Sequence, residues 1–197
     1  YGFLAVGRTN SDLSNSSPFG VFSYGTMNCS VNPCGMVLDY STDLTVSKGN
    51  LVASDKNIKF YDVSYRNAAG TAAIIGAFEG NLTFHNSQVS GIVAQGSWDI
   101  IVAQVNSTLG VSGVNRIGGN GYDAGKAIES VSGGGYLIGA EVKGQFTSTR
   151  PFNGSYFSNA GGRDIGVFQL YDNLTIFSNQ NLGGSGTVQL SDISMES

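Results

Sequence analysis

The chain has 197 residues and a formal net charge of −4, and only 12% of its residues are charged. It carries no block of lysine or arginine, so the electrostatic footprint of a nucleic-acid-binding protein is missing. With 41% hydrophobic residues the sequence is not of the disordered class, yet no apolar run approaches the roughly 20 residues of a membrane span. We therefore expect a single folded domain, with two small domains as the alternative, and no nucleic-acid partner and no membrane span in the mature chain.

The first seven residues, YGFLAVG, have the composition of a β-strand. Fully extended, they reach about 23 Å, which is a common strand length. Two placements are open: the strand folds back onto its own domain, or it pairs with a neighbouring subunit. Either face of the strand is apolar, so the sequence leaves two candidates for its inward face: Tyr1, Phe3 and Ala5, or Leu4 and Val6.

Residues 8–18 are polar and are interpreted as a linker to a β-sandwich body that spans 19–197. Within the body, Gly, Asn, Asp and Ser interrupt short apolar segments about every 8–12 residues, and almost no helical pattern occurs. Segment 98–105 is apolar on both parities at its centre, which is typical of a central strand. The predicted strands are 19–24, 36–40, 43–47, 58–65, 71–78, 81–86, 90–95, 98–105, 107–114, 126–132, 135–144, 154–158, 164–171, 173–179 and 186–193.

This pattern predicts an all-β fold, an immunoglobulin-like or jelly-roll β-sandwich with an additional N-terminal strand. The glycine-rich segment 116–125 is predicted to be a long loop, and it lacks the strand-to-helix context of a phosphate-binding loop. Segments within 81–114 resemble β-helix coils. We find no fixed period that holds across the chain, which argues against a solenoid.

The two cysteines, Cys29 and Cys34, flank Asn32-Pro33 and are predicted to form a disulfide across a turn. Two free thiols are the alternative. Two cysteines and one histidine, His85, cannot supply the four ligands of a structural zinc site, so no metal site is expected. A disulfide implies an oxidising compartment or the cytosol of an extreme thermophile.

Six Asn-X-Ser/Thr sequons occur, about twice the number that this composition gives by chance. They begin at Asn15, Asn28, Asn81, Asn106, Asn153 and Asn173. The first residue is not methionine, so we expect that a secretory signal peptide has been removed, with an artificially trimmed start as the alternative. Together with the disulfide, these features predict an extracellular protein that carries N-linked glycans and no other cofactor.

No pattern of catalytic residues stands out. His85 belongs to no nucleophile motif, and the 14 acidic residues are scattered singly, so the chain is predicted not to be an enzyme. The alternative function is that of a secreted carbohydrate-binding or adhesin domain, because Trp98, nine tyrosines and eleven phenylalanines offer material for a sugar-stacking platform. Core packing is the other interpretation of these aromatic residues. A viral capsid or fibre jelly roll and a secreted enzyme are two further interpretations.

The apolar start, polar linker, all-β body, close cysteine pair and many sequons together resemble the subunits of the archaeal thread, a glycosylated extracellular filament of thermoacidophiles. A camelysin-like jelly-roll fibre protein is a related possibility. The resemblance implies a cell-surface filament built as a head-to-tail homopolymer of identical subunits, with surface glycans or other cells as further partners. It also implies glycans on the six sequons. The implied donor strand, which completes the sandwich of the adjacent subunit, comprises Tyr1, Phe3, Leu4, Ala5 and Val6.

Overall fold

The computed structural model of the chain describes residues 3–10, 29, 32–66, 70–84, 89, 91–152 and 161–195. These residues form strands and turns and contain no helix, so the predicted all-β class is confirmed. The strands are β1 (Phe3–Thr9), β2 (Cys34–Tyr40), β3 (Val46–Ser54), β4 (Ile58–Arg66), β5 (Thr71–Phe78), β6 (Asn81–Phe84), β7 (Ile92–Val93), β8 (Asp99–Val105), β9 (Val111–Gly119), β10 (Ala124–Ser130), β11 (Tyr136–Val142), β12 (Phe146–Ser148), β13 (Asp164–Leu170) and β14 (Ile176–Leu182).

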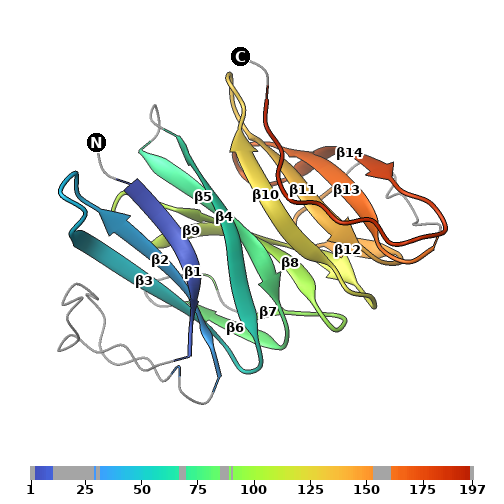
Figure 1. Cartoon of the computed structure of the whole chain (residues 1–197), viewed down its shortest axis with the longest axis horizontal. Coiled ribbons are helices and arrows are strands. Elements are labelled where there is room, and N and C mark those ends of the chain that lie inside the picture. The colour runs from blue at the N-terminus through green and yellow to red at the C-terminus, as the bar shows by residue number, and fades with distance from the viewer. Residues whose placement is uncertain are drawn as a thin grey trace.

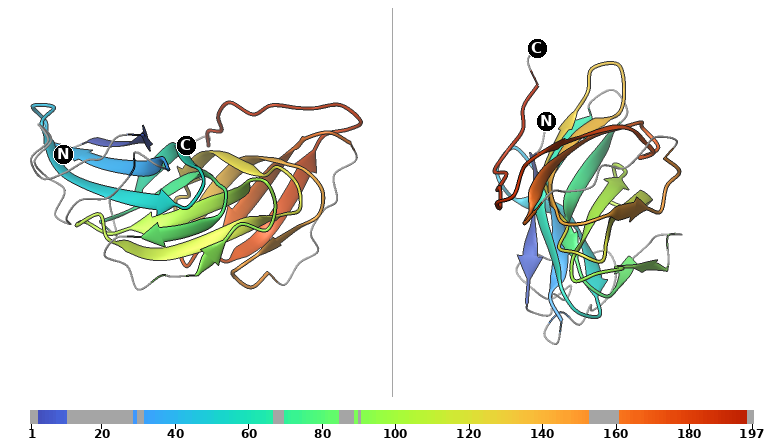
Figure 2. Two further views of the ribbon diagram at one scale, coloured as in Figure 1. Left: turned by 90° about the horizontal axis from the view of Figure 1, so that it is seen from below. Right: turned by 90° about the vertical axis from the view of Figure 1, so that its right-hand side faces the viewer.

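The strands build three antiparallel sheets that stack as layers (Figure 1). The first sheet has the order β1-β2-β3-β6-β7, the middle sheet β12-β9-β8-β5-β4, and the third sheet β10-β11-β13-β14. β1 and the C-terminal segment lie on the same side of this stack (Figure 2). The sandwich predicted from the sequence thus has three layers.

Two separate hydrophobic cores hold the layers together, one on each face of the middle sheet. On β5, Ala72 and Ile74 point into the core shared with the first sheet. Their neighbours Ala73 and Ile75 point into the core shared with the third sheet. Since successive side chains of a strand point to opposite faces, a strand buried on both faces must be apolar on both parities. This explains the continuous apolar run of β8, which was predicted to be a central strand.

A β-hairpin recurs in each sheet at a fixed spacing. The hairpins β2–β3, β8–β9 and β13–β14 begin at Cys34, Asp99 and Asp164, which are equally spaced along the chain. We call this spacing the repeat interval. Each hairpin has a register shift next to its turn, located between Asp39/Tyr40, Gln104/Val105 and Gln169/Leu170, and these positions differ by the same interval. The expectation that no fixed period holds across the chain is therefore wrong.

The repeat interval also relates other strands. β4 pairs with β5 and β10 pairs with β11, and their register shifts, at Phe60/Asp62 and Gly125/Ala127, lie one repeat interval apart. β5 and β11 each pair with the first strand of a hairpin, and so does β1, which pairs with β2. Strands β1, β5 and β11 thus occupy matching places in the three sheets.

The hairpin turns explain why three strand predictions began too early. In each turn a leucine has a left-handed backbone: φ is 62° at Leu44, 60° at Leu109 and 64° at Leu174. The leucine N–H donates to the carbonyl oxygen three residues earlier, as in a type I turn that ends in a left-handed residue. Because this leucine is apolar, segments 43–47, 107–114 and 173–179 were predicted to be strands that include it. In the structure, β3, β9 and β14 begin after the leucine.

Two further expectations are corrected. The glycine-rich segment 116–125 is not a long loop, because β9 continues to Gly119 and β10 begins at Ala124. Its glycines permit close strand contacts: a Cβ on Gly119 would lie 1.9 Å from the carbonyl oxygen of Gln145. The predicted strand at 186–193 is not part of any sheet in the described part of the chain. Predicted strands 19–24 and 154–158 lie outside the described residues.

Candidate functional site: the two ends of the sheet stack

β1 forms one outer edge of the first sheet. It pairs with β2 antiparallel, with Phe3 opposite Tyr40. Leu4 and Val6 pack against the core between the first and middle sheets, which identifies the inward face of the strand. Phe3 is 58% exposed. Of the two placements left open by the sequence, the single chain has β1 on its own domain. No strand pairs with its outer edge among the described residues.

The structure moves one predicted boundary and leaves several predicted residues undescribed. β1 continues past residue 7 and ends at Thr9, so part of the predicted linker 8–18 belongs to the strand. The linker beyond residue 10 lies outside the described residues, as do Tyr1, Asn15, Asn28, His85 and Asn153.

At the other end of the stack, residues 188–195 run beside β11, on the near side of the molecule in Figure 1 (red). A Cβ on Gly139 of β11 would lie 2.3 Å from Leu190 and 2.9 Å from Ile193, so the segment presses closely on the third sheet. Asp192 and Ser194 are exposed. The sequence prediction treated this segment as a strand and did not indicate its packing on the third sheet. The available signal is the similarity of residues 188–195, VQLSDISM, to residues 58–65 of β4, IKFYDVSY.

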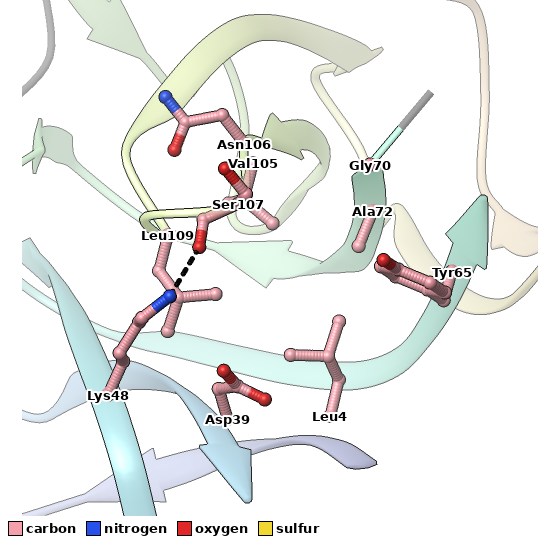
Figure 3. A pocket seen from close by; sticks show the side chains of 10 residues that line it. All are labelled: Leu4, Asp39, Lys48, Tyr65, Gly70, Ala72, Val105, Asn106, Ser107 and Leu109. Carbon is pink, nitrogen blue, oxygen red and sulfur yellow. Dashed lines mark hydrogen bonds between the residues drawn. The ribbon is translucent and has the colours of Figure 1, made fainter. Parts of the chain in front are cut away.

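A cavity of about 530 Å³ opens between the first and middle sheets, near the start of β1 (Figure 3). Leu4 and Leu109 contribute apolar walls, and Asp39, Tyr65 and Asn106 add polar groups. The Lys48 ammonium closes one side by donating to the carbonyl oxygen of Ser107 at 2.9 Å. The cavity is therefore amphipathic, with an exposed tyrosine at its rim.

Three of the six sequons lie in the described residues, and all three asparagines are exposed. Asn106 and Asn173 lie in hairpin turns, where the side-chain oxygen of each accepts a backbone N–H two residues later, at 3.0 Å in both turns. Asn81 starts β6, and its amide nitrogen donates to the Asp55 carboxylate at 2.7 Å. Asn106 and Asn173 thus present an amide group that is held in place by its own turn.

Cys29 and Cys34 form a disulfide, as predicted, with their Cα atoms 5.4 Å apart. Both cysteines are completely buried, and they pack with Leu38 and Leu51 in a small cluster on the first sheet. The disulfide therefore ties the chain before β2 to the face of the first sheet that points away from the middle sheet.

Buried charges connect the strands near the end of β9. Arg116 forms an ion pair with Asp99 at 2.9 Å, and both side chains are almost fully buried. Asp123 is also buried and accepts N–H groups from Gly119 at 3.0 Å and Lys143 at 2.9 Å. Burial raises the pKa of Asp123 to about 6, although these hydrogen bonds oppose the shift. These groups connect β9 with the chain that leaves β11.

Among the described residues, the exposed aromatic side chains do not gather on one platform. Trp98 is half-buried, with its ring 6.4 Å from that of Tyr122 and the Lys59 ammonium 5.5 Å from its centroid. Tyr171 and Phe177 form a separate exposed pair on the third sheet, 4.6 Å apart. Tyr65 is the aromatic residue that lines the cavity described above.

No protein-family model and no curated protein matches the sequence. Within the described ranges, no group of three His, Cys, Asp or Glu side chains is placed to hold a metal ion. The same part of the chain contains no helix long and apolar enough to cross a membrane.

Proposed function

We propose that the protein is a structural subunit of an extracellular cell-surface filament, in which β1 makes the contact between identical subunits. The observation that carries this proposal is the position of β1. It is the edge strand of a sheet, no other described strand pairs with its outer edge, and Phe3 on it is largely exposed. An exposed sheet edge is a ready template for pairing with another chain.

Other features support an exported building block. The disulfide fits an oxidising environment. Asn106 and Asn173 offer exposed glycan acceptors on hairpin turns. The glycans and the export were expected from the sequons, the cysteine pair and the first residue, and the filament from the resemblance to archaeal thread subunits. They remain proposals for this chain.

The contact through β1 has a favourable apolar component. Full burial of a side chain such as Phe3 contributes about 1.5–3 kcal/mol before the costs of association. Backbone hydrogen bonds along the strand would set register and direction. A contact between two different surfaces of the same subunit does not close on itself, so it extends into a filament.

Two exposed apolar residues at opposite edges of the first sheet allow a matched test. Phe3 lies on β1, and Val93 lies on β7 with 48% exposure. We expect Phe3→Ser to raise the concentration needed for assembly by about tenfold, which corresponds to about 1.4 kcal/mol. Val93→Ser should leave it unchanged. Light scattering and negative-stain microscopy measure both. Equal effects of the two variants, or a wild-type protein that stays monomeric at all concentrations, contradict the proposal.

The amphipathic cavity favours a second candidate function, that of a carbohydrate-binding or adhesin domain. Tyr65 is 53% exposed at its rim, near the hydrogen-bonding groups of Asp39 and Asn106. An aromatic face beside polar groups is suited to a sugar ring. Tyr65→Ala would then abolish glycan binding measured on an array and leave assembly unchanged. Absence of glycan binding by the wild-type protein excludes this candidate.

A further inference from the structure

Within the described part of the chain, the first sheet lacks a strand that the other two sheets have. In the middle sheet β4 pairs with the outer edge of β5, and in the third sheet β10 pairs with the outer edge of β11. β1 occupies the matching place, because the three strands pair with the first strand of their hairpins in the same register. The matching pairs are Phe3 with Tyr40, Ala72 with Val105 and Tyr136 with Leu170. No strand among the described residues pairs with the outer edge of β1.

A segment that matches the missing strand lies at the other end of the chain. Residues 188–195, VQLSDISM, follow residues 58–65 of β4, IKFYDVSY, by two repeat intervals. Apolar residues match at Val188 and Ile58, at Leu190 and Phe60, and at Ile193 and Val63. Two polar residues are identical in the two segments: Asp192 matches Asp62, and Ser194 matches Ser64. The backbone N–H that follows each aspartate bonds to its carboxylate, at 2.8 Å in both segments.

Exposed apolar residues at the two ends of the stack match residues that are buried within it. Leu44 in the turn of the first hairpin is 70% exposed, whereas Leu109 and Leu174 at the same place fill the two cores. On β14, Leu182 is 57% exposed, whereas the matching Ile117 on β9 is completely buried. Leu44 and Leu182 thus lack, in the single chain, the cover that a neighbouring sheet gives to the matching residues inside the stack.

We propose that residues 188–195 of one copy pair antiparallel with β1 of a second copy, so that the first sheet of the second copy stacks on the third sheet of the first. The repeat gives the register: Met195 opposite Phe3, Ile193 opposite Ala5, Asp192 opposite Val6 and Leu190 opposite Gly7. This inference rests on the proposed filament function and specifies its joint. The donated strand is the C-terminal one, and β1 stays on its own β2.

The side chains at the predicted joint have a precedent inside the molecule. The Asp62 carboxylate accepts the N–H of Ile128 and the Ser64 hydroxyl accepts the N–H of Ser130, both at 2.8 Å, which joins the edge strands of the middle and third sheets. Asp192 and Ser194 are the same residue types, two repeat intervals later, and are exposed. In the joint, Ser194 accepts the N–H of Tyr65 of the second copy, and Asp192 lies beside Val63 of that copy.

Cysteine cross-linking between separately produced copies tests the register. A full-length protein that carries Ala5→Cys is mixed with one that carries Ile193→Cys, and the mixture is oxidised under assembly conditions. We expect a disulfide between these positions in most subunits, identified by mass spectrometry of peptides. Gln189→Cys, on the same segment but four residues away, is the matched control and should link to position 5 at least tenfold less.

A third cysteine variant, Leu38→Cys, distinguishes this joint from an exchange of the N-terminal strand between copies. If β1 leaves its own sheet and enters that of a neighbour, Ala5 faces Leu38 of that neighbour, as it faces its own Leu38 here. Filaments in which Ala5→Cys links to Leu38→Cys of another copy, and not to Ile193→Cys, overturn this inference and leave the proposed function standing. A protein that neither assembles nor cross-links overturns both.

Discussion

At the scale of single residues, three leucines adopt a backbone that glycine or asparagine usually occupies. A left-handed conformation costs an L-residue about 1–2 kcal/mol. Leu109 and Leu174 offset this cost by burying their side chains in the two cores, whereas Leu44 is 70% exposed. The sequence could not reveal this, because a leucine followed by a threonine or glycine and then by a valine or isoleucine has the composition of a strand.

Replacement of these leucines by glycine should therefore have opposite effects. In the monomer, Leu44→Gly relieves the left-handed strain and loses little burial, so the free energy of unfolding rises by up to about 1 kcal/mol. Leu174→Gly removes a completely buried side chain and lowers it by about 2–5 kcal/mol. Urea unfolding followed by circular dichroism measures both. A loss of stability of similar size in the two variants contradicts this account of the turn.

The carboxyl group of Asp123 predicts a pH dependence of stability. Its folded pKa of about 6 lies above the ordinary value of 3.8, because the group is buried. Between these values the folded protein binds more protons than the unfolded chain, so its stability falls as the pH rises from about 4 to 6. The contribution is on the order of 2–3 kcal/mol.

We expect Asp123→Asn to lack this component. The difference in unfolding free energy between pH 4 and pH 7 is measured for the wild-type protein and the variant. Carboxyl groups with a lowered pKa, such as Asp43 and Asp55, change stability in the opposite direction but are common to both proteins. Identical pH profiles would show that Asp123 ionises in the folded protein as it does in the unfolded chain.

At the scale of elements, the sequence predicted most strands, because alternation and turn residues mark them. β5 was predicted with its bounds correct, and β8 was identified as central from its apolar run. Pairing between strands could not be predicted, since it depends on contacts between residues far apart in the chain. The same holds for segment 116–125, whose glycines serve close contacts with neighbouring strands and not a loop.

Gly125 tests how closely the third sheet approaches the middle one. A Cβ at this position of β10 would lie 2.3 Å from Ile75 of β5, inside a packed core. Gly125→Ala should lower the free energy of unfolding by about 1–3 kcal/mol, as is typical of overpacking. Gly184→Ala is the control, because no atom lies within 4 Å of a Cβ there. Thermal unfolding of both variants measures the difference, and equal melting temperatures contradict close packing at Gly125.

At the scale of the whole molecule, the fold is a stack of sheets that repeats at a constant interval along the chain, with an exposed leucine at each end, Leu44 and Leu182. The period was not recognised in the sequence, because few positions that lie one repeat interval apart have the same residue type. Val37, Val102 and Val167 are identical, but the neighbouring residues differ in size and polarity. The secretion, glycosylation and filament expected from the sequence stay predictions. Among the described residues, the open outer edge of β1 and the last segment, which belongs to none of the three sheets, match each other.

Electron cryo-microscopy of filaments assembled from the full chain tests this continuity most directly. Stacked sheets lie about 10 Å apart, so three layers per subunit predict an axial rise of about 30 Å. The map should show residues 188–195 as a strand paired with β1 of the next subunit. Filaments joined by β1 on the β2 strand of a neighbour, or subunits whose sheets do not stack across the joint, would contradict the account.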